Sequence, residues 1–141
     1  MRRYLVVANQ TLGGDHLVAA LRRRLERGPC SFYVVVPASH PADHAWTDGE
    51  VLAVARERLE KALTRFRELG AEVEGEVGDP SPYIAVEDAI RTGEFDEIIL
   101  STLPPGVSRW LKKDLPHRIA RMTRIPVKHL IAQPEPASKA G

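Results

Sequence analysis

A dense group of hydroxyl and basic side chains lies in the C-terminal third of the chain. Ser101 and Thr102 follow an apolar run, and Ser108, Arg109 and Lys113 come soon afterwards. Such side chains donate hydrogen bonds to anions, and a helix beginning here would add free backbone N–H groups and the positive end of its dipole. The group therefore predicts a site for an anion such as phosphate. The same residues would also form the solvated basic face of an amphipathic helix, and this alternative stays open.

Two further loops carry residues with chemistry of their own. His40, Asp43 and His44 lie close together, but they include one carboxylate and no cysteine, which favours a polar surface loop over a zinc site. Residues 11–14, Thr-Leu-Gly-Gly, precede a predicted helix, but the Gly-Lys-Ser/Thr of a P-loop is absent, as is GxGxxG. We therefore predict no metal site and no conventional dinucleotide or P-loop site.

Residue patterns for catalysis are weak. No serine lies in a nucleophile-elbow pattern. Cys30 follows a Gly-Pro pair and precedes an apolar run, which indicates a buried and inert thiol. Asp79 is accounted for by its place in a turn, and Glu87 by its place on an exposed helix face, so neither carboxylate indicates catalysis. We predict no catalytic residue, and hence a protein that is not an enzyme.

The composition is that of an ordinary globular protein. The chain has 141 residues, of which 43% are hydrophobic and 28% charged, enough for one compact domain. A net charge of +1 gives no general attraction to nucleic acid or to membranes. No apolar run approaches the roughly 20 residues of a membrane span, and no signal peptide is evident. We expect a cytoplasmic protein that binds neither nucleic acid nor membrane, with one domain over residues 1–132 and a disordered tail over 133–141.

Short apolar runs alternate with amphipathic stretches along the chain. The helices are predicted to begin near Asp15, Asp48, Ser81 and Ser108, with the first three as N-caps. Strands joined by such helices must be parallel. We predict a doubly wound α/β fold with a five-stranded parallel sheet in the Rossmann-like or flavodoxin-like order 3-2-1-4-5 and helices on both faces. The predicted strands are 4–8, 31–36, 71–77, 97–100 and 127–131.

Strand order, the Gly-Asp-Pro turn at 78–80 and the segment 98–127 resemble the universal stress protein family over the whole ordered chain. In that family, a loop of pattern G-x-x-G-x9-G-[ST] after strand four holds the phosphates and ribose of ATP. Gly106 matches the second glycine, but Leu103 replaces the first, and the final pair is replaced by Pro-His at 116–117. Asn9 stands where the family has an acidic residue after strand one. The resemblance is therefore to a degenerate member of the family.

The resemblance implies a non-enzymatic domain that binds ATP or AMP weakly through this loop. The Val36 backbone is expected to approach the adenine ring, Gly106 and Ser108 to donate to phosphate, and Arg109 and Lys113 to neutralise its charge. The full set of predicted binding residues is Asn9, Val36, Gly78, Ser101, Thr102, Gly106, Ser108, Arg109 and Lys113.

Two alternatives to nucleotide binding stay open at this point. The first is a dimeric interaction or regulatory module, because in the family the last strand often pairs across a two-fold axis. Here Val127, His129 and Ile131 alternate along that strand and would form the homodimer contact. The second alternative is an enzyme of the related nucleotide-using α/β superfamily.

Overall fold

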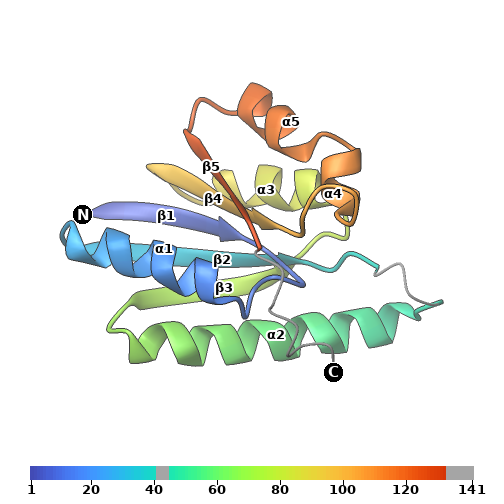
Figure 1. Ribbon diagram of the computed structural model, residues 1–141, viewed down its shortest axis with the longest axis horizontal. Coiled ribbons are helices and arrows are strands. Elements are labelled where there is room, and N and C mark those ends of the chain that lie inside the picture. The colour runs from blue at the N-terminus through green and yellow to red at the C-terminus, as the bar shows by residue number, and fades with distance from the viewer. Residues whose placement is uncertain (41–44, 133–141) are drawn as a thin grey trace.

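A computed structural model of the chain describes residues 1–40 and 45–132, and its five parallel strands form one sheet (Figure 1). The strand order is β3-β2-β1-β4-β5, which confirms the predicted fold class and order. Asp43, His44 and the tail predicted over 133–141 lie outside the described residues. The strands are β1 (Arg2–Val7), β2 (Cys30–Pro37), β3 (Glu72–Gly78), β4 (Glu97–Thr102) and β5 (Val127–Ile131).

The three central strands are apolar because helices cover both of their faces. Val6 of β1 lies in register with Val34 of β2 and Ile99 of β4, and all three side chains are fully buried. Parallel strands that are buried on both faces consist of uninterrupted apolar residues, which is why these strands could be predicted from the sequence. The helices are α1 (Asp15–Glu26), α2 (Asp48–Glu68), α3 (Pro82–Ile90), α4 (Arg109–Lys112) and α5 (Leu115–Met122).

Two hydrophobic cores lie on opposite faces of the sheet. Leu21 of α1 and Phe66 of α2 pack in the core that contains Val6. Val86 of α3 and Ile119 of α5 pack in the other core. Figure 1 shows α1 and α2 on one side of the sheet and α3 and α5 on the other. Within the described residues, no helix has the length and apolar composition that crossing a membrane would require.

The helix starts correct two predicted caps. Thr47, and not Asp48, caps α2: its hydroxyl accepts from the Glu50 amide at 3.1 Å, and the Glu50 carboxylate accepts from the Thr47 amide at 2.9 Å. This reciprocal pair is a capping box, and it leaves Asp48 in the first turn. Asp15 also lies inside its helix, because Gly14 is the residue at the N-cap position of α1. Ser81 caps α3 as predicted.

Arg24 and Ile84 are exceptions to the burial that is usual for their residue types. Arg24 of α1 is 5% exposed, and its Nε lies 2.9 Å from Glu97 Oε1 on β4. Ile84 of α3 is 41% exposed. α4 and α5 are separate helices, and Asp114 between them adopts a left-handed conformation with φ of 55°.

Candidate functional site

A cavity of about 760 Å³ lies beyond the carboxyl ends of the strands. Its walls come from the loop after β1, the first residues after β2, the start of α3, the loop after β4, and helices α4 and α5. Parallel α/β sheets bind ligands at this edge, where the strand order reverses between β1 and β4. A volume of this size suits a small organic ligand.

Six of the nine predicted binding residues line this cavity. Asn9 comes from the loop after β1, while the others come from β4 and the segment that follows it. The fold thus brings together two parts of the chain that are about 90 residues apart, as the contact between Thr11 and Ser101 shows. The six residues are Asn9, Ser101, Thr102, Ser108, Arg109 and Lys113.

The other three predicted residues do not line the cavity. Val36 is fully buried inside β2. Gly78 faces α3 so closely that an added Cβ would lie 2.9 Å from the Ala85 Cβ, which gives this glycine a packing role. Gly106 lies in the loop after β4 with φ of 89°, a conformation that glycine adopts readily.

Asn9 joins β1 to two neighbouring elements. Its amide nitrogen donates to the Pro37 carbonyl oxygen at 2.8 Å, and its amide oxygen accepts from Arg58 Nη1 at 2.5 Å. The side chain is 8% exposed. Both ends of this amide are therefore engaged within the protein, and Arg58 of α2 carries a positive charge to the end of β1.

Two lining residues of the cavity, Thr11 and Ser101, form a chain of polar contacts with His16 behind them. Ser101 Oγ lies 2.6 Å from Thr11 Oγ1 and 2.8 Å from His16 Nε2. Burial lowers the pKa of His16 below its ordinary value of 6.5, while the nearby Asp15 carboxylate opposes part of that shift. Gly14 makes room for the imidazole, because an added Cβ there would lie 2.4 Å from two ring atoms of His16.

Thr102 makes a second hydroxyl contact on the other face of β4. Its hydroxyl donates to the Leu103 carbonyl oxygen at 2.9 Å and lies 2.8 Å from His129 Nε2 on β5. Since the hydroxyl hydrogen is used for Leu103, the His129 Nε2–H is the donor to Thr102. Burial lowers the pKa of His129, which favours the neutral ring.

A basic wall, made of Arg109, Lys113 and Arg118, borders the cavity on the side of α4 and α5. Arg118 lies over the ring of Tyr83 from α3, with its Cζ 4.6 Å from the ring centroid. Ser108 is buried and caps α4 by accepting from the Leu111 amide at 3.2 Å. The wall combines positive charge with an aromatic surface.

The same stretch of sequence carries two basic residues that do not contribute to the wall. Lys112 and His117 are exposed and do not line the cavity. His117 instead lies 2.8 Å from the Asp114 carboxylate. Only some of the basic residues in this stretch therefore face the cavity.

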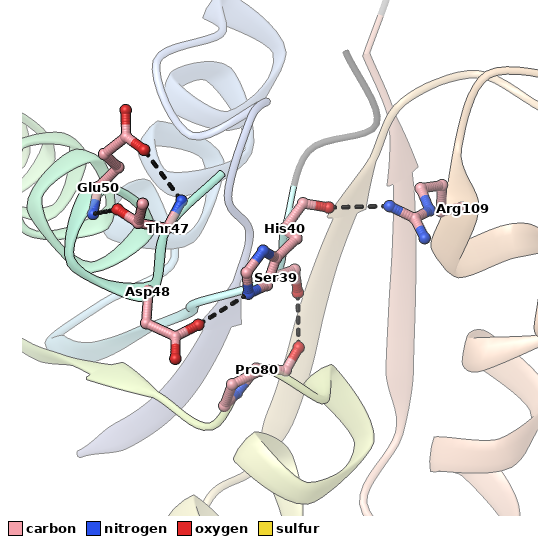
Figure 2. A network of polar contacts seen from close by, with 7 residues as sticks. All are labelled: Ser39, His40, Thr47, Asp48, Glu50, Pro80 and Arg109. Carbon is pink, nitrogen blue, oxygen red and sulfur yellow. Dashed lines mark hydrogen bonds and ion pairs between the residues drawn. The ribbon is translucent and has the colours of Figure 1, made fainter. Parts of the chain in front are cut away.

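Figure 2 shows how the rim of the cavity is held together near the end of β2. Arg109 Nη1 donates to the His40 carbonyl oxygen at 2.9 Å, and the Ser39 hydroxyl donates to the Pro80 carbonyl oxygen at 2.8 Å. His40 Nε2 lies 3.3 Å from Asp48 Oδ1 at the start of α2. The residues after β2 thus connect α2, the β3–α3 turn and the start of α4.

Sequence reasoning missed several residues that line the cavity or contact its lining. Thr11 and His16 gain their significance from Ser101, which is 90 and 85 residues away. Tyr83 and Arg118 meet only because α3 and α5 cover the same face of the sheet. The one local signal was the position of Thr11 in a loop that follows a strand, where ligands of such folds are found.

Metal binding finds no support in the described part of the chain. No group of three or more His, Cys, Asp or Glu side chains is positioned there to hold an ion. Of the three residues weighed as ligands, His40 contacts Asp48, while Asp43 and His44 lie outside the described residues.

Comparison with known proteins identifies the fold through solved structures. No family model and no curated protein sequence matches the chain. A universal stress protein from Archaeoglobus fulgidus in complex with dAMP superposes with a TM-score of 0.63 at 16% identity, covering 94% of this chain and 98% of that one.

Two further solved structures give the same result. A universal stress protein family protein from Arabidopsis thaliana with AMP bound has a TM-score of 0.64 at 11% identity, covering 98% of this chain and 99% of that one. A universal stress protein in complex with cAMP has a TM-score of 0.62 at 14% identity, with coverage of 94% and 98%. The chain therefore has the fold of universal stress proteins, as the resemblance in its sequence implied.

Proposed function

We propose that this protein binds an adenine nucleotide of the AMP or ATP class in the cavity at the carboxyl ends of its strands, without turning it over. The observation that carries the proposal is the basic wall, which places Arg109, Lys113 and Arg118 around one cavity of suitable size. Three proteins of the same fold are bound to AMP, dAMP and cAMP, which supports an adenine nucleotide over other anions.

In this proposal, side chains take over the phosphate contacts from the loop backbone. Pro104 and Pro105 have no N–H to donate. The amides of Val107 and Ser108 both donate to the Pro104 carbonyl oxygen, at 3.1 and 3.0 Å. These backbone donors are therefore used within the loop itself, which agrees with the loss of the first glycine at Leu103. Guanidinium and ammonium groups of the basic wall are the charged donors to phosphate in this proposal, and each charge-assisted hydrogen bond is stronger than a neutral one.

The polar end of the cavity would then hold the nucleoside. Ser101 and Thr102 form the floor there, and Asn9 and Ser39 line the same cavity. Hydroxyl groups in this place are suited to the ribose, and a degenerate phosphate loop implies weak affinity. The Val36 backbone, predicted to approach the adenine ring, does not line the cavity.

Isothermal titration with ATP, ADP, AMP and adenosine tests the proposal. We expect affinity to rise with the number of phosphates, with adenosine the weakest ligand, because the basic wall contributes through charge. Affinity should also fall as salt is added. Absence of heat at millimolar nucleotide, together with an unchanged melting temperature, would rule out nucleotide binding in this cavity.

We further propose a homodimer that forms through β5. On either side of β5, the Pro126 carbonyl and the Ala132 amide point toward β4, where they bond Ile98 and Thr102. Because backbone groups alternate along a strand, those of Val127, His129 and Ile131 are expected to point away from the sheet. Sedimentation equilibrium tests this: a strict monomer at high micromolar concentration contradicts it.

A further inference from the structure

The Ser101–His16 contact has a geometry that nucleotide binding does not require. Ser101 is the fifth residue of β4, while His16 lies in the first turn of α1, and their side chains meet at 2.8 Å, with His16 behind the residues that line the cavity. Ser101 is only 1% exposed, yet it lines the cavity. A hydroxyl at this distance from an imidazole nitrogen is the arrangement in which a histidine removes the proton of a nucleophilic serine.

The groups around Ser101 favour transfer of its hydroxyl proton to His16. Burial lowers the pKa of His16 and so favours the neutral ring, which in its Nδ1–H tautomer accepts from Ser101 through the Nε2 lone pair. Thr11 Oγ1, 2.6 Å from Ser101 Oγ, is placed to donate to it, which turns the hydrogen of Ser101 toward His16. Thr11 is thus a positioning residue for the serine.

Two features at the start of α1 hold the imidazole and favour its neutral form. Gly14 leaves the space that the His16 ring occupies, since an added Cβ would lie 2.4 Å from the ring. His16 lies in the first turn of a helix of 12 residues, where the positive end of the helix dipole favours the neutral imidazole over the imidazolium. The groups that position Ser101 thus all come from residues 11–16, between β1 and the first turn of α1.

We propose that Ser101 is a nucleophile, activated by His16, that accepts the acyl group of an ester or anhydride with an anionic leaving group. The Ser101 Oγ bonds to the carbonyl carbon while its proton passes to His16 Nε2. The bond from that carbon to the leaving oxygen breaks, and the electron pair departs on the oxygen. His16 then passes the proton to the leaving group or to solvent.

Water completes the cycle. A water molecule attacks the acyl carbon and gives a proton to neutral His16, and that proton returns to Ser101 Oγ as the carboxylic acid leaves. The net reaction is hydrolysis of the ester. Arg109, Lys113 and Arg118 border the same cavity, which favours leaving groups such as an aryloxide or a phosphate.

A fluorophosphonate probe and p-nitrophenyl acetate test this proposal on the intact protein. We expect one covalent adduct per chain, placed on Ser101 by tandem mass spectrometry, and release of p-nitrophenol above the rate in buffer. Ser101→Ala should remove both signals. His16→Gln keeps a hydrogen-bonding group but no base, and should slow both by about 10²- to 10⁴-fold. Ser31→Ala and His117→Gln change residues that do not line the cavity and should react like the unchanged protein.

Three results would overturn the proposal: no adduct, an adduct on another residue, or unchanged labelling of S101A or H16Q. Urea unfolding of each variant shows whether a loss of labelling reflects a loss of the fold. If S101A is unfolded, S101C keeps a nucleophile of similar size at the same place. Its thiol should react with iodoacetamide, and more slowly when His16→Gln is added; an unreactive thiol there, or one indifferent to H16Q, would count against activation by His16.

Discussion

Arg58 Nη1 lies 2.5 Å from Asn9 Oδ1, so a cation from α2 is held at the end of β1 by an amide that also donates to Pro37. Asn9→Ala should lower the free energy of unfolding by about 1–3 kcal/mol, because it leaves the Pro37 carbonyl and the Arg58 guanidinium without their partner. Urea unfolding measures the difference. Gln10→Ala, which changes the exposed neighbour, is the control and should be near neutral. Equal stability of the two variants would mean that the amide contributes nothing.

Nucleotide affinity should depend on the residues of the basic wall and not on the nearby exposed lysine. Arg118→Ala and Lys113→Ala are each expected to weaken ATP binding about 10-fold, the effect of losing one charge-assisted hydrogen bond worth about 1.4 kcal/mol. Lys112→Ala removes the same kind of charge from a side chain that does not line the cavity. Isothermal titration compares the three variants. If Lys112→Ala weakens binding as much as the others, general attraction of charge explains the binding better than a site.

The strands could be predicted from sequence because burial on both faces leaves a clear pattern. All five strands lie within two residues of their predicted bounds. Parallel pairing then followed from the helices between the strands. The helix caps were harder, since Thr47 and Asp48 are both good capping residues and only the contact with Glu50 distinguishes them.

The cavity could be predicted only in part, because its key contacts join residues that are distant in sequence. Arg24 looks like any exposed arginine of α1 until Glu97, 73 residues away, is placed beside it. Likewise, a search for local nucleophile patterns passes over Ser101, since its contact with His16 arises from the packing of α1 against β4. Hydrophobic periodicity predicts which face of an element is buried, but it carries no information on which polar groups meet there.

Stability should fall as the solution is acidified through the titration range of two half-buried histidines, His16 and His129. Burial lowers the pKa of His16 and of His129 below the ordinary value of 6.5, so the unfolded chain binds protons before the folded one does. The stabilisation is fully present above pH 6.5 and is lost as the pH falls from there through the lower pKa of the folded state. Urea unfolding between neutral and mildly acidic pH should show the slope. H16Q and H129Q should each reduce it, and an unchanged slope in both variants would contradict the prediction.

Gly75 is required by close packing where β3 crosses beneath α2. An added Cβ would lie 2.5 Å from the Val34 carbonyl oxygen and 2.8 Å from Leu59 Cδ1. Gly75→Ala should therefore destabilise the fold by about 1–3 kcal/mol through overpacking. Gly49→Ala is the matched control: its Cβ would come no nearer than 4.0 Å to another residue, and alanine in this helix should stabilise by about 0.5–1 kcal/mol. Melting temperatures that move in the same direction for both variants would contradict the packing argument.

The homodimer proposed through β5 depends on backbone hydrogen bonds between the two copies. At Ile131, the contributions of the backbone amide and of the side chain can be tested separately. Ile131 is 38% exposed, and its amide is among those expected to point away from β4. Ile131→Pro removes that amide hydrogen but no bond of the sheet, since proline is tolerated where an edge N–H faces solvent. We expect I131P to fold and to dissociate into monomers at concentrations where the unchanged protein is dimeric. Ile131→Ala keeps the amide and should remain a dimer, unless the contact is made by side chains. Sedimentation equilibrium measures both, and a dimer that survives I131P would show that β5 does not pair with its copy.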